Sequence, residues 1–490
     1  MEFDKDLCAI QEARDCAAKA AEAAKELQDF TAEQIDAIVK AMAEAGEAHA
    51  EELAQMAHDE TGFGKVSDKI YKNHLGSGIL YDAIKDMKTT GIIDEDKENK
   101  TLTIAYPVGP IMGILPCTNP TSTVFYKSII ALKARNPIVI SPHPAALKCT
   151  VKAAAYMAEA AEAAGAPKNS VQCLSYASME GSNALMHDDN IKLIIATGGP
   201  GMVKAAYSAG KPAIGVGAGN SPAYIERTAN VKEAVEMILA SKTFDYSTVC
   251  ASEQSIICEK CNEAEVIAEF KRQGGYFMSE EETAKCCKVI FKNGHTMKAD
   301  FVSKSAKVIA DAAGFAVPEN TKVLIGRQGG VGPAYPLSYE KLTEVLAFYT
   351  VEDWHEACEL SKKLLVNGIG HTMSLHTQDP EIALAFTAKP ASRILVNTGG
   401  AMGGTGASTG MFPAFTLGCG TLGGSSVSDN VTPLHLINKK VLAYGIKDPR
   451  TLAADDEQFQ RLHGNAAKEN VSISSDDLQN VIDAVLKALR

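Results

Sequence analysis

The stretch that decides the fold class is Ile191-Lys-Leu-Ile-Ile-Ala-Thr-Gly-Gly-Pro-Gly-Met-Val203. Its first five residues form a short apolar run that is typical of a buried strand, and the glycine turn that follows opens a helix. Glycines at a turn from strand to helix let the N-terminus of the helix approach a pyrophosphate. The turn is not the Gly-x-Gly-x-x-Gly fingerprint of a Rossmann domain. Taken alone, it is equally consistent with a tight turn that holds no ligand.

Similar apolar runs lie on both sides of this stretch, and helix-like segments such as residues 145–164, 231–241 and 353–366 separate them. Residues 1–90, rich in Ala, Glu and Lys, predict amphipathic helices. Buried strands that alternate with helices predict an α/β protein with a parallel, doubly wound sheet. The predicted strands are 102–106, 111–115, 137–141, 170–174, 191–195, 223–225, 255–257, 322–325, 393–396 and 439–444.

Composition excludes several classes of protein. The chain has 490 residues, which suits two or three domains, and a net charge of −12 argues against a nucleic-acid binder. No apolar run reaches the roughly 18 residues that a membrane span needs. The N-terminus shows no apolar core of a signal peptide, so we expect a cytoplasmic protein whose twelve cysteines are reduced thiols.

Two segments carry candidate catalytic groups. Cys250 lies among small hydroxylated residues, where an exposed turn and its backbone amides favour a thiolate, although most cysteines are simply buried small hydrophobes. The loop 116–123 follows a predicted strand and offers Thr118 and Asn119 as donors to a developing oxyanion. Its alternative is a plain turn between two prolines.

Seven motifs, in order over about residues 1–445, together resemble the CoA-acylating branch of the aldehyde dehydrogenase superfamily. The resemblance is to the aldehyde dehydrogenase half of the bifunctional aldehyde–alcohol dehydrogenases. Seven motifs in register are a specific match. They are residues 116–123, 141–144, 196–204, 211–220, 249–254, 370–372 and 416–420.

The resemblance implies that Cys250 is the nucleophile, forming a thiohemiacetal and then a thioester from which coenzyme A (CoA) removes the acyl group. It also implies an oxyanion site built from the Cys250 amide and the side chain of Asn119 or Thr118. Hydrolytic relatives carry a Glu that activates water, and the corresponding stretch 215–220 holds no carboxylate. Because water lacks this base, the sequence favours thiolysis.

For the cofactor, the resemblance implies a pyrophosphate on the helix opened by Gly198, Gly199, Gly201 and Val203, with Gly217 and Gly219 nearby. Ser141 and His143 would contact the adenosine. Glu340 would hold the nicotinamide ribose, its alternative being a solvated surface acid. The sequence shows no cluster of basic residues that would bind the 2′-phosphate of NADP, so NAD is preferred to NADP. The cysteine pairs at 258/261 and 286/287 do not have the spacing of a zinc site, and we expect no metal.

The implied fold is the aldehyde dehydrogenase fold, with an NAD-binding domain over 1–240, a catalytic domain over 241–425 and a return segment at 426–446 for a homodimer or tetramer. Residues 447–474 read as a polar linker. Residues 475–490 read as an amphipathic helix that docks on its own subunit or, as an encapsulation peptide, on a bacterial microcompartment shell.

The favoured function is NAD-dependent conversion of acetaldehyde to its acyl-CoA, in the cytoplasm or a microcompartment lumen. Its alternatives are the same chemistry on sulfoacetaldehyde or another short substituted aldehyde, a hydrolytic dehydrogenase, and a shell-binding structural protein.

Overall fold

The structure is a computed structural model that describes residues 4–447. Its described residues divide into two compact units, of which the first comprises residues 4–91 and 105–438 and the second 92–104 and 439–447. The predicted helix at 475–490, and all but the first residue of the predicted linker, lie outside the described residues.

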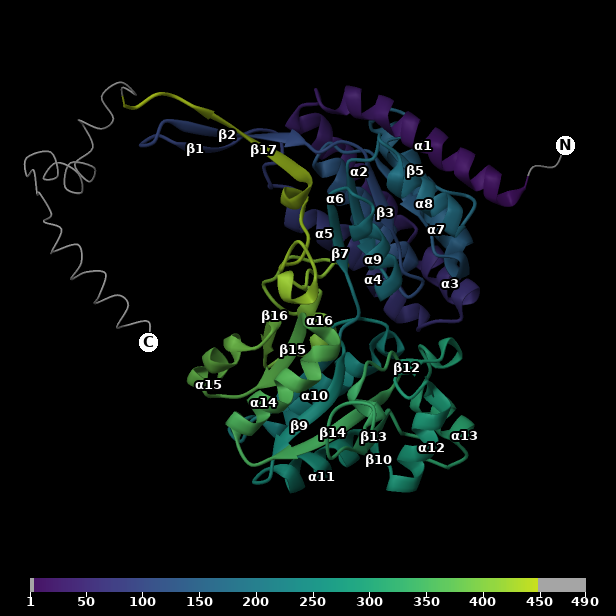
Figure 1. The fold of residues 1–490 in the computed structure, drawn as a ribbon, viewed down its shortest axis with the longest axis vertical. Helices are drawn as coiled ribbons and strands as arrows, with labels where there is room; N and C mark the ends of the chain where they lie inside the picture. Colours follow the sequence, from purple (N-terminus) through teal and green to yellow (C-terminus); the bar gives the residue numbers. More distant parts are fainter. Residues whose placement is uncertain (1–3, 448–490) are drawn as a thin grey trace, which may run out of the picture. The chain divides into compact units, whose positions relative to one another are not determined.

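The first sheet of the first unit is parallel and has five strands, with β3 at its centre (Figure 1). In spatial order the strands are β5 (Val171–Cys173), β4 (Ile138–Ser141), β3 (Ile111–Ile114), β6 (Leu193–Thr197) and β7 (Ala213–Val216). The helices that connect them are α6 (Pro120–Lys133), α7 (Leu147–Ala163), α8 (Met179–His187) and α9 (Pro200–Ser208). The chain runs outward from β3 in one direction and later from β6 in the other. In such sheets ligands bind at the carboxyl ends of the strands where the order reverses, here β3 and β6.

Five helices precede this sheet and confirm the predicted helical region. They are α1 (Lys5–Leu27), α2 (Ala32–Ala48), α3 (Ala50–Thr61), α4 (Val66–Gly76) and α5 (Gly78–Ile84). Thr31 and Gln34 close a capping box at the start of α2, which satisfies amide groups that a helix end leaves unpaired. Alanine dominates the buried face of α1, so its neighbour α8 can approach closely.

The second sheet is also parallel and has seven strands. In order they are β10 (Gly275–Phe277), β13 (Val323–Arg327), β14 (Val345–Val351), β9 (Glu253–Glu259), β8 (Ser221–Ile225), β15 (Gly370–His376) and β16 (Ala391–Val396). The accompanying helices are α10 (Val231–Thr243), α11 (Glu263–Gln273), α12 (Glu280–Ile290), α13 (Ala306–Ala313), α14 (Trp354–Leu365), α15 (Pro380–Ala385) and α16 (Gly400–Gly404). A short pair, β11 (Phe291–Lys292) and β12 (Thr296–Met297), stands apart. Two parallel sheets with connecting helices confirm the predicted α/β class.

The point at which the chain passes from the first sheet to the second differs from the domain boundary predicted at residue 240. Strand β8 hydrogen-bonds to β9 and β15, so it belongs to the second sheet. Helix α10 packs its apolar face in the same core as these strands. The transition therefore falls between β7 and β8, because the partners of a strand, and not its own composition, decide which sheet it joins.

The second unit is built around a three-stranded sheet of β1 (Gly91–Asp96), β2 (Thr101–Pro107) and β17 (Ile437–Ala443). Strand β17 lies in the predicted return segment, whereas β1 was not predicted. Apolar side chains on and just after β17, including Val441 and Tyr444, are exposed. Among residues 4–447, no helix combines the length and the apolar character that crossing a membrane requires.

Candidate active site

A cavity of about 660 Å³ in the first unit collects most of the predicted site residues. It lies at the carboxyl ends of β3 and β6, where the switch in strand order predicts a ligand, and it extends to the turn before β9. Its lining includes Thr118, Asn119, Ser141, His143, Gly198, Gly199, Gly217, Cys250 and Glu340.

Cys250 lies just before β9, after a turn with unusual backbone geometry. Asp245, Tyr246 and Ser247 all have positive φ angles, of 49°, 52° and 65°. Residues other than glycine rarely adopt this left-handed region, and such backbone strain clusters at functional sites. Burial raises the pKa of the Cys250 thiol to about 12, although the positive charge of Arg393 acts in the opposite direction. At neutral pH the thiol therefore carries a proton, which it must give up before attacking a carbonyl.

His371 lies next to the backbone of Cys250. A Cβ placed on Gly219 would come within 1.9 Å of the Cys250 carbonyl oxygen and 3.4 Å of the His371 ring. Nδ1 of His371 lies 2.8 Å from the Thr372 hydroxyl, and Nε2 has no hydrogen-bond partner among the described residues. Burial lowers the pKa of His371 to about 3, so the ring is neutral at pH 7 and is a weak proton acceptor. The sequence alone leaves two interpretations of His371, a side chain that approaches CoA or the substrate and a structural histidine.

Thr118 and Asn119 are not equivalent. The Asn119 amide nitrogen donates to the Thr248 carbonyl and to the Thr118 hydroxyl oxygen, both at 3.1 Å. An amide nitrogen carries two hydrogens, so both are used within the protein. The Thr118 hydroxyl accepts one of these bonds and keeps its own hydrogen for another partner. Of the two residues that the sequence offers, the structure therefore favours Thr118 as the donor to an oxyanion.

The glycines around the start of α9 leave open space. A Cβ added to Gly198, Gly199 or Gly217 would meet no atom within 4 Å. Gly199 is the N-cap of α9, so a pyrophosphate at this point would face free backbone amides and the positive end of the helix dipole. The donor set and the space fit a dinucleotide.

Three predicted cofactor residues do not line the cavity. Gly201 lies in the first turn of α9, and Val203 packs against β7, within 2.8 Å of a Cβ built on Gly215. The close approach of Gly219 to Cys250 gives this glycine a packing role. The sequence could not separate these residues from their neighbours, because periodicity does not show which side of a turn faces a ligand.

The remaining predicted cofactor residues line the cavity. The Ser141 hydroxyl lies 2.8 Å from that of Ser182, and Nδ1 of His143 accepts the Ala145 amide, which leaves Nε2 with the proton of the neutral ring. Oε1 of Glu340 accepts the Gly219 amide at 3.1 Å, and burial raises the pKa of Glu340 to about 7. Among the described lining residues, Glu340 is the one acid.

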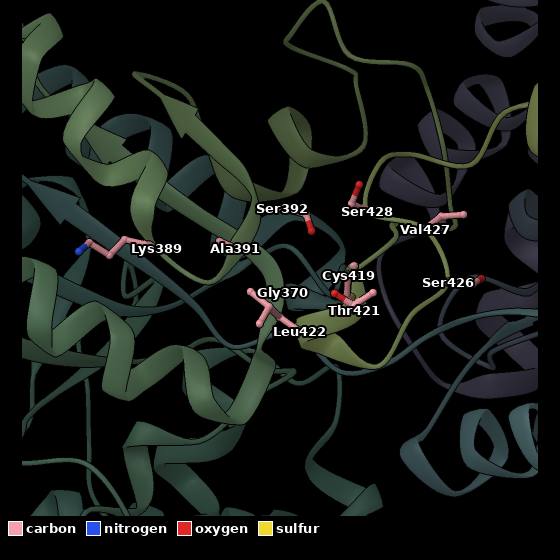
Figure 2. Close-up of a pocket in the computed structure, with 11 residues that line it drawn as sticks. Gly370, Lys389, Ala391, Ser392, Cys419, Thr421, Leu422, Ser426, Val427 and Ser428 are labelled. Carbon is pink, nitrogen blue, oxygen red and sulfur yellow. The ribbon is translucent and has the colours of Figure 1, made fainter. Parts of the chain in front are cut away.

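A smaller cavity of about 340 Å³ lies at the start of β15 and β16 (Figure 2). Cys419 lines this cavity and not the one that holds Cys250, and its Sγ donates to the Leu417 carbonyl at 3.5 Å. Figure 2 shows the Lys389 side chain directed away from the other labelled residues. Within residues 4–447, no group of three or more His, Cys, Asp or Glu side chains is arranged to hold a metal ion.

Residues 6–276 match the model of the aldehyde dehydrogenase family. The chain is 48% identical over 428 residues to the bifunctional aldehyde-alcohol dehydrogenase AdhE of Escherichia coli, covering 86% of this chain and 48% of the relative. It is 37% identical over 435 residues to the acetylating succinate-semialdehyde dehydrogenase of Clostridium kluyveri, covering 88% and 95%. The chain thus spans about half the length of AdhE and nearly all of the second relative.

The fold matches the crystal structure of an acetylating aldehyde dehydrogenase from Geobacillus thermoglucosidasius, with a TM-score of 0.89 and 49% identity over 91% of this chain and 99% of that one. These matches agree with the two parallel sheets and their connecting helices. The chain therefore belongs to the aldehyde dehydrogenase family, within its acylating branch.

Proposed function

We propose that this chain converts a small, uncharged aldehyde, NAD and CoA into an acyl-CoA and NADH, with Cys250 as the nucleophile. The main support for this proposal is that one cavity is lined by Cys250, by Thr118 and by the open glycine turn that begins α9. The stretch 215–220, which contributes residues 216–218 to the lining of this cavity, has no carboxylate that would activate water.

In the proposed mechanism, the Cys250 thiol first loses its proton to water in the cavity. The Cys250 sulfur then forms a bond to the carbonyl carbon, and the electron pair of the C=O bond moves onto oxygen. The Thr118 hydroxyl and the Cys250 amide stabilise that oxyanion. A bound nicotinamide supplies a hydride acceptor, and the carbon left on Cys250 becomes a thioester. The sulfur of CoA then attacks this thioester and regenerates Cys250.

Gly198, Gly199 and Gly217 would hold the pyrophosphate, His143 and Ser141 would flank the adenosine, and Glu340 would bind the nicotinamide ribose. We propose NAD because no Lys or Arg is among the described residues that line the cavity, so nothing there pairs with a 2′-phosphate. A solved structure of an engineered glycolyl-CoA reductase holds NADP+, and one of a Rhodopseudomonas palustris propionaldehyde dehydrogenase holds CoA and an acylated cysteine.

The residues that line the cavity also indicate whether the aldehyde substrate is neutral or anionic. Relatives are named for succinate semialdehyde and for sulfoacetaldehyde, both of which carry an anionic group. Arg393 is a buried cation whose charge acts on Cys250 but which does not line the cavity, and it donates to the Asn430 side chain at 2.7 Å and to the Gly418 and His371 carbonyls at 2.8 and 3.2 Å. Since the guanidinium is held by these bonds and stands outside the cavity lining, it is not placed to pair with a substrate there. We therefore favour acetaldehyde over sulfoacetaldehyde.

With NAD and CoA, kcat/KM for acetaldehyde is expected to exceed that for sulfoacetaldehyde and for succinate semialdehyde by about 100-fold or more. Burying an unpaired anion costs several kcal/mol, and each 1.4 kcal/mol is about a factor of ten. Steady-state NADH formation across neutral and anionic aldehydes of similar length measures this ratio. A preference for sulfoacetaldehyde would contradict the neutral-substrate proposal while leaving the acylating chemistry intact.

We also propose that the second unit serves a homodimer or tetramer and that residues 475–490 direct the enzyme into a microcompartment. The exposed apolar residues on β17 support the first proposal. The apolar stripe of the segment, which includes Leu478 and Val485, supports the second, as does the similarity to a propionaldehyde dehydrogenase from a Clostridium phytofermentans microcompartment, at 27% identity and a TM-score of 0.79.

Deletion of residues 470–490 should leave kcat and the melting temperature unchanged, because an address tag does not contribute to the core. A fluorescent protein that carries residues 450–490 should co-localise with shells, and the same fusion with Val485→Asp, which breaks the apolar stripe, should not. A fall of several degrees in melting temperature, together with a diffuse fusion, would show that the segment docks on its own subunit.

A further inference from the structure

Two lysines on one face of α4 lie buried beside the loop that follows β3. Lys69 and Lys72 are 3% and 2% exposed, and both pair with the fully buried carboxylate of Asp245. The distances from Asp245 Oδ2 are 3.2 Å to Lys69 Nζ and 2.5 Å to Lys72 Nζ. These three residues are called the lysine–aspartate cluster below. Buried charges are stable only where opposite charges and hydrogen bonds offset the cost of desolvation, so the three side chains of the cluster depend on one another.

The cluster reaches both sides of the proposed active site. Lys69 Nζ donates to the Thr118 carbonyl at 3.1 Å, and Lys72 Nζ donates to Asn119 Oδ1 at 2.6 Å. On the other side, Asp245 begins the strained turn that leads to Cys250, and Thr248 donates to its Oδ2 at 2.7 Å. One set of charges therefore joins the loop of the candidate oxyanion donor to the turn of the candidate nucleophile.

Asp245 is held at several atoms, which explains how three successive residues keep positive φ angles. Its Oδ1 accepts the Lys65 amide at 2.7 Å, and its own amide donates to Asp68 Oδ2 at 2.8 Å. A Cβ on Gly64 would come within 1.9 Å of Asp245 Oδ1, so the chain also closes tightly over the carboxylate. Strained backbone persists only where its surroundings determine it completely.

The bond from Lys72 helps to fix the orientation of the Asn119 side-chain amide. Because the ammonium group can only donate, it requires the amide oxygen of Asn119 to face it. The amide nitrogen then points to the Thr248 carbonyl and the Thr118 hydroxyl oxygen. The hydroxyl accepts this bond and directs its own hydrogen elsewhere. Without Lys72, the Asn119 amide would lose one of the two bonds that fix its orientation, the other being its bond to the Thr248 carbonyl, and the Thr118 hydroxyl would be less firmly oriented.

We infer that Lys72 is a positioning residue that acts through Asn119 to make the Thr118 hydroxyl the side-chain donor to the oxyanion formed on Cys250. This inference rests on the proposed function. It predicts that Lys72 and Thr118 belong to one energetic unit, although no hydrogen bond joins them directly. Residues that act as a unit give non-additive losses when they are replaced together.

The test is a double-mutant cycle on the rate of the first NADH turnover, with enzyme, NAD and acetaldehyde mixed rapidly. Thr118→Val removes the hydroxyl and should lower this rate about 100-fold. Lys72→Met should lower it about tenfold or more, with KM for NAD unchanged. In the Thr118→Val background, Lys72→Met should cost less than about twofold further. Losses that multiply, or a Thr118→Val variant with the wild-type rate, would overturn the inference.

Two further variants separate positioning from folding. Lys72→Gln keeps an N–H donor for Asn119 Oδ1 without the charge, and it should recover most of the rate lost in Lys72→Met; equal losses in both variants would overturn the inference. Lys133→Met removes another buried lysine, which pairs with Asp36 at 2.5 Å at the far end of α6, about 20 Å away along the helix. It should lower the melting temperature and leave the first-turnover rate unchanged.

The outcomes also separate this inference from the proposed function. A wild-type chain that forms no NADH from any aldehyde contradicts the proposed function, and the inference with it. An active wild type whose variants show multiplicative losses contradicts the inference alone.

Discussion

Cys250→Ala is expected to lower NADH formation from acetaldehyde by about 10⁴-fold or more, because the variant lacks the atom that forms the covalent bond. NAD binding should survive, since the glycines that would hold the pyrophosphate lie at the start of α9 and at Gly217, not on the Cys250 turn. Titration of NAD by protein fluorescence measures binding, and absorbance at the NADH band measures turnover. Activity within tenfold of the wild type would contradict the assignment of the nucleophile.

The matched control is Cys419→Ala. Cys419 is a second buried cysteine whose charge would influence Cys250, but it lines the smaller cavity. Its replacement should leave turnover within a few-fold of the wild type. If Cys419→Ala lost activity and Cys250→Ala kept it, Cys419 and not Cys250 would be the nucleophile.

Omission of CoA is expected to stop the reaction after a single burst of about one NADH per active site. The thioester on Cys250 then accumulates, because CoA is absent and the 215–220 stretch supplies no base to activate water. Addition of CoA to the stalled enzyme should release the acyl group and restart turnover. Stopped-flow absorbance gives the burst, and mass spectrometry of the stalled protein shows whether the acyl group is on Cys250.

Glu340 provides the sharpest challenge to this expectation. It is the one acid among the described cavity-lining residues, and burial raises its pKa to about 7, a value suited to a general base. If Glu340 activated water, the wild type would turn over to free acid without CoA, and Glu340→Gln would stop it. That result would contradict the acylating proposal. If Glu340 instead holds the nicotinamide ribose, Glu340→Gln should raise KM for NAD and leave the single burst without CoA in place.

Local sequence pattern determined the parts of this molecule that depend on near neighbours. Apolar runs predicted β3, β4 and β6, and the glycines after β6 predicted the turn that opens α9, because strand burial and helix starts are decided within about ten residues. The order of these elements was enough to predict the parallel α/β class. The motif around Cys250 likewise marked the turn that the structure places in the main cavity.

Tertiary structure alone decided the features that depend on distant partners. Strand β8 reads like any buried strand, and only its pairing with β9 and β15 assigns it to the second sheet. Thr118 and Asn119 are adjacent and chemically similar as donors. What separates them is the set of bonds on Asn119, to Thr118, to Thr248 and from Lys72, which is 47 residues from Asn119 and 173 from Asp245 along the chain. A hydrogen bond across such a separation exists only once the fold has closed, so no local pattern could have revealed which side chain keeps a free hydrogen.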